Sequence, residues 1–363
     1  MNVRVIVAMS GGVDSSVAAA ILAEQGYDVV GIAMRLAPDG APRTDRRGSC
    51  CSYDDFEDAR RVAELMNFPF YVVDLRDEFS ARVIAPFVGE YLSGRTPNPC
   101  LLCNRDIKFD RLWDRAGALG AGYIATGHYA RIERDAHGAF RLLKAVDARK
   151  DQSYFLFTLG QNQLSRTLFP LGSMTKDEVR EKARKMRLAN AEKPESQEIC
   201  FVPGGDHAAF IEQRSRPGQI RAGNVVDSAG HSLARHGGIH RFTIGQRRGL
   251  GIAAGEPLYV SRINPDNGDV TVGSRGELSA AGFRAANLTW VDPRIPASSD
   301  LDVEVKIRYR HPAVAARLRI LAGDRAEVSF GRENPAVTPG QACVFYRGEE
   351  VLGGGCIEGT LEN

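Results

Sequence analysis

The sequence predicts an α/β protein whose N-terminal part is a doubly wound parallel sheet and whose C-terminal part consists of small β-rich domains. Over the first ~130 residues, short β-branched runs alternate with helical patterns, which is typical of a parallel sheet with helices on both faces. Beyond Pro203, short alternating runs are separated by turn signals, such as those at residues 264–268 and 339–340. The chain has 363 residues, too many for one ordinary core at ~100–200 residues per domain.

The elements of the N-terminal part follow from hydrophobic spacing and from the residues that end each segment. Four strands are expected, at residues 3–9, 28–34, 70–73 and 123–126. Helical spacing lies between them at residues 15–25, 54–66 and 104–119, and each of these helices is followed by a left-handed cap residue, Gly26, Asn67 or Gly120. Pro86 should break or kink a further helix around residues 78–92.

A basic helix is expected at residues 175–187, where Thr175 and Glu178 form a capping box. The change of pattern after it predicts a boundary near residue 205, and a second boundary is expected near residue 280. The predicted domains are therefore 1–204, 205–280 and 281–363.

Charge, hydropathy and cysteine content limit the cellular setting. The net charge of +2 neither predicts nor excludes a nucleic-acid partner. No segment approaches the ~18 apolar residues of a membrane helix, and the N-terminus reads as a strand rather than an export signal. Seven cysteines in a long chain favour reduced, reactive or metal-binding thiols over a disulfide framework. We expect a cytoplasmic protein without a membrane partner.

The string SGGVDS at residues 10–15 lies between the first strand and an Ala-rich helix, which is where a backbone loop can bind phosphate. It matches the pyrophosphatase-type loop of adenylating enzymes and lacks the Lys of a Walker A loop. This pattern predicts transfer of AMP with release of pyrophosphate, rather than γ-phosphoryl transfer. Asp14 is a candidate Mg²⁺ ligand, or alternatively a helix cap. Met34, at the carboxyl edge of the sheet, is a candidate adenine contact, or alternatively a core residue.

Two cysteine sites are candidates for thiol chemistry. Cys100 and Cys103 form a CxxC on a proline-stiffened loop directly before a helix, where a thiol pKa is lowered, and Cys200 lies on a loop near the first domain boundary. A single CxxC is weak evidence for zinc, so no metal site is assigned. Cys50 and Cys51 lie in a polar loop without an assigned role. These residues leave two classes open, an ATP-using sulfur transferase and a redox-regulated ATP-dependent ligase.

Further strings are spread along most of the chain: TPNP at 96–99, CN at 103–104, IKF at 107–109, ATGHYAR at 125–131, KDQSY at 150–154, SQ at 196–197, ICF at 199–201, GQRRGL at 245–250, RYR at 308–310 and LGGG at 352–355. Together with SGGVDS, they resemble the bacterial tRNA-specific 2-thiouridylases. The resemblance implies a pyrophosphatase-loop domain of the adenine nucleotide α hydrolase type, a small central domain and a C-terminal β-barrel.

The resemblance also implies roles for individual residues. ATP, with Mg²⁺, would be bound by Ala8, Met9, Ser10, Gly11, Gly12, Val13, Asp14, Ser15, Met34 and Gly127. The target base would face Asn98, Pro99 and Cys100, and the tRNA would contact Lys150, Asp151, Gln152, Arg308 and Tyr309. Cys103 would be the nucleophile and Cys200 the persulfide carrier, with Asp14 as a third catalytic residue. Basic segments at 176–187, 241–248 and 306–311 are candidates for tracking tRNA phosphates.

The implied reaction is 2-thiolation of the wobble uridine in tRNAs for Lys, Glu and Gln, through adenylation of the C2 oxygen. A persulfide on Cys200 would deliver sulfur, a Cys103–Cys200 disulfide would follow, and AMP and pyrophosphate would be released. The partners implied are tRNA and a persulfide sulfur-carrier or cysteine desulfurase protein. Two alternatives stay open. Cys100, Cys103 and Cys200 are able in principle to hold an iron–sulfur cluster, although we favour the persulfide route, and an amide-forming ligase is the rival enzyme class.

Overall fold

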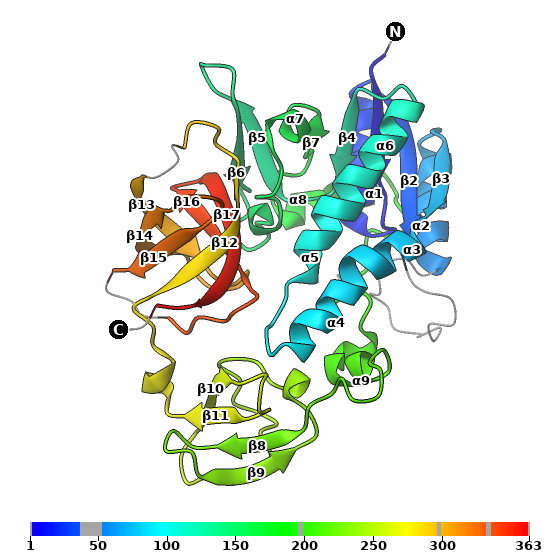
Figure 1. Ribbon diagram of the computed structural model, residues 1–363. Coiled ribbons are helices and arrows are strands. Elements are labelled where there is room, and N and C mark those ends of the chain that lie inside the picture. Colours follow the sequence, from blue (N-terminus) through cyan, green and yellow to red (C-terminus); the bar gives the residue numbers. More distant parts are fainter. Residues whose placement is uncertain (1, 37–52, 195–198, 296–298, 332–334, 362–363) are drawn as a thin grey trace.

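The computed structural model describes residues 2–36, 53–194, 199–295, 299–331 and 335–361. Three sheets organise these residues: a parallel sheet near the N-terminus, a small central sheet and a large sheet that contains a barrel. The parallel sheet and the barrel lie beside each other, and the central sheet lies below both in Figure 1. None of the described helices is both long enough and apolar enough to cross a membrane.

The N-terminal sheet has five parallel strands in the order β3-β2-β1-β4-β7. The four predicted strands are confirmed as β1 (Arg4–Ala8), β2 (Asp28–Arg35), β3 (Phe70–Asp74) and β4 (Tyr123–Thr126). The fifth strand, β7 (Thr167–Leu168), has only two residues and follows the short helix α7 (Gln161–Leu164), so no periodic pattern predicted it. The strand order reverses between β1 and β4, and at such a switch point an α/β sheet opens a ligand crevice at its carboxyl edge.

Helices cover both faces of this sheet, which confirms the doubly wound prediction. One face packs on α1 (Val13–Glu24), α2 (Tyr53–Leu65) and α8 (Lys176–Lys185), through a cluster that includes Val7, Val17, Val62 and Val179. The other face packs on α4 (Ala85–Leu92) and α6 (Asp110–Ala118), through Ile6, Ile32, Phe87 and Leu112.

Two helical runs on that second face are irregular. The run around Pro86 consists of α3 (Arg76–Phe79), a π-helical turn, η1 (Ser80–Ile84), and then α4, with Pro86 in the first turn of α4. The run is thus irregular just before Pro86, but Pro86 does not break it. The run expected at residues 104–119 begins earlier, with α5 (Pro99–Leu102), and continues as a second π-helical turn, η2 (Cys103–Phe109), before α6. The expectation that the CxxC precedes a helix is wrong, because Pro99 already stands in the first turn.

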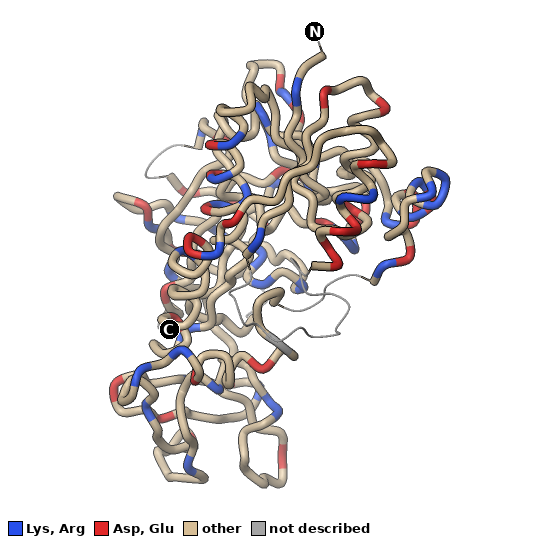
Figure 2. Tube along the Cα trace, turned by 90° about the vertical axis from the view of Figure 1, so that its right-hand side faces the viewer, with Lys and Arg blue, Asp and Glu red and all other residues tan. Residues whose placement is uncertain are grey.

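The central sheet has four strands in the order β10-β11-β8-β9. Their bounds are β8 (Gly223–Val226), β9 (Ser232–His236), β10 (Tyr259–Ile263) and β11 (Val270–Gly273), and α9 (His207–Glu212) precedes them. Figure 2 shows this sheet set off from the larger bodies, and Lys and Arg are interspersed with Asp and Glu along the trace.

The C-terminal strands close into a six-stranded barrel, as the sequence resemblance predicted, because the first strand pairs with the last. The strands are β12 (Gly282–Trp290), β13 (Asp300–Lys306), β14 (Val314–Ile320), β15 (Ala326–Phe330), β16 (Ala342–Arg347) and β17 (Glu350–Thr360). Phe283, Leu318 and Phe345 fill the interior.

A hairpin from the N-terminal half extends the barrel sheet. Its strands are β5 (Ala130–Arg134) and β6 (Phe140–Lys144), and β6 pairs with β17 through Leu142 and Val351. Leu142, Tyr154, Val344 and Tyr346 form a buried cluster between the two halves of the chain. Contacts therefore cross the predicted boundaries at residues 205 and 280, and those boundaries stay predictions.

Candidate active site

The SGGVDS loop connects β1 to α1 at the switch point of the parallel sheet. Gly11 has a φ of 74°, and a Cβ at this position would lie 2.2 Å from the Asp55 carbonyl oxygen. Only glycine therefore fits both the left-handed conformation and the close contact with α2. Gly12 is the N-cap of α1 and has no side chain that could accept a hydrogen bond. The first amides of the helix are therefore left to other acceptors.

Ser15 and Gly127 fix the shape of the loop from two sides. The Ser15 hydroxyl donates to the Gly12 carbonyl at 3.1 Å and accepts from the Ser10 amide at 3.1 Å. A Cβ on Gly127 would lie 2.7 Å from the Ser15 nitrogen, so the end of β4 packs directly on the start of α1. Gly127 thus lies against the loop with which the sequence resemblance grouped it.

Asp14 faces two donors from later parts of the chain. The Lys176 ammonium lies 2.7 Å and 2.8 Å from its two carboxylate oxygens, and the Tyr129 hydroxyl donates to it at 2.8 Å. Lys176 is buried, although the sequence assigned its segment to tRNA phosphates. The signal that could have found it is the capping box, which sets Lys176 at the first helical position of α8.

A second pair of residues, which the sequence did not single out, supports the loop from behind. The Asn190 amide donates to the Gly11 carbonyl at 2.9 Å and to the Ser16 hydroxyl at 2.8 Å. The Lys193 ammonium lies 2.6 Å from Asp55 and 2.7 Å from Asp58. Burial alone would lower the pKa of Lys193, but its hydrogen bonds to these two carboxylates raise it.

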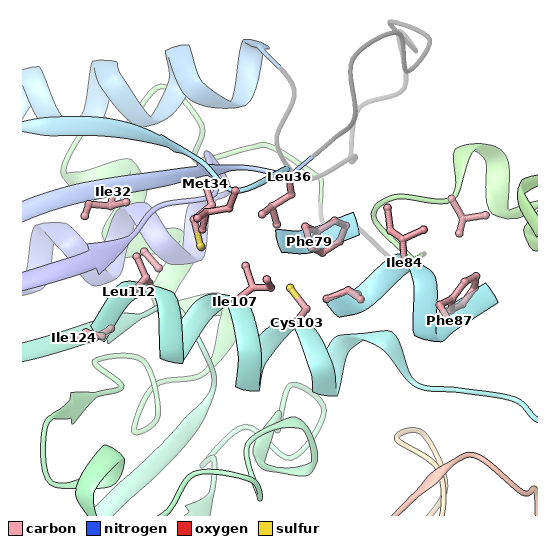
Figure 3. Packing of buried hydrophobic residues seen from close by; sticks show 14 of the residues in the cluster. Ile32, Met34, Leu36, Phe79, Ile84, Phe87, Cys103, Ile107, Leu112 and Ile124 are labelled. Atoms are coloured by element: carbon pink, nitrogen blue, oxygen red, sulfur yellow. The ribbon is translucent and has the colours of Figure 1, made fainter. Parts of the chain in front are cut away.

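Met34 and Cys103 belong to one apolar cluster on the second face of the sheet, as Figure 3 shows. Ile199 and Phe201, on either side of Cys200, pack against the same cluster. The structure therefore brings the region of Cys200 to the cluster that holds Cys103. Cys103 is buried, Cys200 is half-buried and Cys100 is exposed.

The TPNP loop lies between the helical run of Cys103 and the barrel. The Gln341 amide donates to the carbonyl oxygens of Thr96, at 2.7 Å, and Pro97, at 3.3 Å. Asn98 caps the run, because its side-chain oxygen accepts from the Cys100 amide at 3.2 Å. Asn98, Pro99 and Cys100 are thus held at the junction of the N-terminal domain and the barrel.

The segment Lys150 to Gln152 reaches the SGGVDS loop through Tyr129. The Gln152 side-chain oxygen accepts from the Tyr129 amide at 3.0 Å, and the Tyr129 hydroxyl contacts Asp14. Asp151 is buried and accepts from the amide and hydroxyl of Ser153. The carboxylate of Asp151 and the side-chain oxygen of Gln152 therefore both bind within the protein.

Arg308 and Tyr309 lie where the barrel meets the central domain. Arg308 donates to the Thr338 hydroxyl at 2.6 Å and to the Ile244 carbonyl at 3.4 Å, and burial lowers the pKa of its guanidinium. The Tyr309 ring lies 4.4 Å from the Phe155 ring. Arg308 thus links two domains in this structure.

Some predicted residues lie outside the described part of the chain: Cys50, Cys51, Ser196 and Gln197. Within the part that is described, no group of three or more His, Cys, Asp or Glu residues is arranged to hold a metal ion.

Comparison with known proteins identifies the family. Residues 3–204 match the tRNA methyl transferase HUP domain, residues 209–274 the tRNA methyl transferase PRC-barrel domain, and residues 280–357 the aminomethyltransferase beta-barrel domain. The chain is 52% identical over 361 residues to the tRNA-specific 2-thiouridylase MnmA of Geobacter metallireducens, covering 99% of this chain and 97% of the relative. It is 54% identical over 358 residues to that of Geotalea uraniireducens, covering 98% and 95%. The chain belongs to the tRNA-specific 2-thiouridylase family.

Membership of the thiouridylase family confirms the resemblance seen in the sequence and the prediction of an enzyme of this type. The family domain names mention methyl transfer, but the relatives that match the chain almost end to end are thiouridylases, such as that of Solibacter usitatus at 52% identity over 366 residues. The order of a HUP domain, a PRC-barrel domain and a β-barrel domain also confirms the predicted fold class.

Proposed function

We propose that this protein is an ATP-dependent tRNA 2-thiouridylase that places sulfur on C2 of the wobble uridine in tRNAs for Lys, Glu and Gln. The observation that carries the proposal is that the SGGVDS loop lies next to both other motifs. The KDQSY segment reaches the loop at Asp14, and the two cysteine motifs meet in one apolar cluster on the same sheet. Tyr129 connects Asp14 to Gln152, and the cluster contains Cys103 together with the neighbours of Cys200.

The loop fits a phosphate chain and a metal ion. Gly11 allows the backbone to turn, the first amides of α1 lack a side-chain cap, and Asp14 offers two carboxylate oxygens. We assign ATP to residues 8–15, with Met34 and Gly127 beside them, and Mg²⁺ to Asp14. ATP supplies the AMP group that makes the C2 oxygen of uridine a good leaving group.

The cysteines supply the sulfur step. In the proposed sequence, the Cys103 thiolate attacks the inner sulfur of a persulfide on Cys200, which forms a Cys103–Cys200 disulfide and releases the outer sulfur as sulfide. Sulfide attacks C2, and the C2 oxygen leaves with AMP. An external thiol reductant reopens the disulfide, and a sulfur-carrier or cysteine desulfurase protein reloads Cys200. The same Cys103 therefore acts in transfer but not in loading.

The tRNA surface is proposed to run over the junction of the three domains. Asn98 to Cys100 would face a uridine drawn out of the anticodon loop, since RNA is read most readily at splayed single-stranded bases. The packing of Tyr309 on Phe155 and the link from Arg308 to Ile244 support a role for this pair in shaping that surface. Because the substrate is tRNA, we propose that the enzyme acts in the cytoplasm.

Product analysis tests the proposal. The protein is incubated with ATP, Mg²⁺, unmodified tRNA and a persulfide donor, and nucleotides and tRNA nucleosides are separated by mass spectrometry. We expect AMP, pyrophosphate and 2-thiouridine, all dependent on tRNA. ADP and phosphate as the main products would overturn the adenylation step, and AMP formation without any need for tRNA would favour the amide-forming ligase.

A further inference from the structure

Lys176 is a buried ammonium group directed at the ATP loop. It lies 2.7 Å and 2.8 Å from the two Asp14 carboxylate oxygens, and only 5% of the residue is exposed. The Tyr129 hydroxyl donates to the same carboxylate. Asp14, the second residue of α1, is thus paired with a cation from α8 that lies 162 residues further along the chain.

We propose that Lys176 binds the β- and γ-phosphates of ATP and so supplies the cation that the loop itself lacks. This inference rests on the proposed function and adds a residue to it. The Lys of a Walker A loop reaches the terminal phosphates from within the loop, and the sequence has none there. Lys176 reaches the same end of α1 from outside, on the flexible stem of a lysine side chain.

The position of Lys176 is set by contacts that do not involve its ammonium. Its backbone amide donates to Asp147 at 3.1 Å, and the capping box of Thr175 and Glu178 fixes the start of α8. Val179 and Ala183 then bury α8 in the cluster that also contains α1. Because the helix is anchored by its backbone and its apolar face, the ammonium is able to change partners without loss of the helix.

The pair with Asp14 is explained better by ligand binding than by stability. A buried ion pair contributes little net stability, because the cost of removing both charges from water offsets most of their attraction. A Mg²⁺ ion held by Asp14 would place two cations at one carboxylate, and the ammonium would then need another anion. Phosphate oxygens at the start of α1 would provide it.

The same position serves the chemical step. The C2 oxygen of uridine forms a bond to the α-phosphorus, the bond from the α-phosphorus to the bridging oxygen breaks, and the electron pair stays on pyrophosphate. Negative charge therefore grows on the leaving group, and an ammonium fixed beside it stabilises that charge. The other lysine at the loop within the described residues, Lys193, contacts the Gly11 carbonyl and two carboxylates, those of Asp55 and Asp58, so we assign the role to Lys176.

Nucleotide affinities separate this role from a structural one. Isothermal titration calorimetry on the full-length protein compares wild type with Lys176→Met, using Mg²⁺ with ATP or AMP. Loss of a charged hydrogen bond to the β- or γ-phosphate should weaken ATP binding by at least about tenfold, while AMP binding stays within about twofold. Lys176→Arg should keep part of the preference for ATP. Lys182→Met is the matched control on the same helix, because Lys182 pairs with Glu24 instead, and it should leave both affinities unchanged.

Equal losses for ATP and AMP in Lys176→Met would overturn the inference in favour of a structural role, and so would unchanged binding of ATP. The thermal midpoint of each variant shows whether the fold is retained. If Lys176→Met does not fold, the ATP and AMP affinities of Lys176→Arg are compared with those of wild type instead. Failure of the proposed function is a different result. Wild-type protein would then bind ATP no more tightly than AMP, or would form no pyrophosphate.

Discussion

The two halves of the candidate site are built from opposite kinds of contact. At the SGGVDS loop, charged and polar side chains from three segments converge: Asp14, Lys176, Asn190 and Lys193 make hydrogen bonds of 2.6–3.3 Å. At the thiol end, Cys103 lies among apolar side chains on a π-helical turn. The loop is thus held in shape by the protein's own side chains, whereas Cys103 is buried among apolar groups. Pre-organisation suits phosphate binding. Burial in apolar surroundings makes a thiol less reactive, so the proposed role of Cys103 requires its thiol to become accessible.

The regularity of the helices also differs between the two halves of the site. Both π-helical turns, η1 and η2, lie on the thiol side of the sheet and contact each other. π-Helical turns in proteins are frequent at functional sites, because the extra residue widens the helix locally. On the loop side, α1 and α8 are regular. The side proposed to bind phosphate therefore has regular helices, and the side proposed to carry sulfur has the less regular backbone.

The largest expected effect is chemical and falls on the thiol end. Replacing Cys103 or Cys200 by Ser should abolish 2-thiouridine formation and leave tRNA and ATP binding unchanged within about twofold, because both thiols act after docking. Cys343→Ser is the control, since Cys343 is buried inside the barrel, where burial raises the pKa of its thiol. Mass spectrometry of tRNA nucleosides and filter binding measure the two quantities. Near-normal thiolation in either variant would show that its assigned role is wrong.

The next effect is on stability and falls on the loop end. Lys193→Met removes the ammonium from Asp55 and Asp58, whose carboxylates are 8% and 21% exposed, and should cost about 2–3 kcal/mol of unfolding free energy. Lys182→Met breaks a more exposed pair with Glu24 and should cost less than about 1 kcal/mol. Urea unfolding of both variants measures the difference. Equal costs would mean that the contacts of Lys193 with Asp55 and Asp58 contribute no more to the free energy of unfolding than a surface ion pair.

Local signals in the sequence predicted the parallel sheet well. The four predicted strands agree with the structure because each depends on spacing within one segment, and the capping box at Thr175 is present. The helix expected at residues 104–119 is the exception, because its run begins at Pro99. The motif residues of the loop could also be found, since glycines and a following helix are adjacent in sequence. What spacing predicts is the element and the residues at its ends.

Long-range partners could not be predicted in this way. Lys176 lies in a strongly basic segment that reads as a solvated face, and only the fold brings it to Asp14. Asn190 and Lys193 have no periodic signal, and the pairing of β6 with β17 joins segments about two hundred residues apart, as Val351 and Leu142 show. The π-helical turn at Cys103 was missed because its apolar spacing is close to that of an ordinary helix.

The smallest expected effect concerns His128, which lies where the loop and the thiol-bearing run meet. It follows Gly127, stacks on Phe109 of η2 at 6.4 Å, and shares a hydrogen bond of 2.7 Å with Thr126. Burial, and secondarily the charge of Lys108, lower the pKa of His128 well below its ordinary value. The folded protein therefore keeps this ring neutral under conditions in which the unfolded chain binds a proton.

The sign of the pH dependence follows from that difference. A lowered pKa in the folded state has no effect on stability above the unfolded value of about 6.5, and stability falls as the pH drops below it, by up to about 1.4 kcal/mol per pH unit for one group. His128→Asn removes the titrating ring, so the stability of wild type should fall more steeply than that of the variant between about pH 6 and pH 5. Urea unfolding at several pH values measures both slopes. Parallel curves for wild type and His128→Asn would mean that the ring is protonated within the fold, and that the junction between the two halves of the site admits a charge.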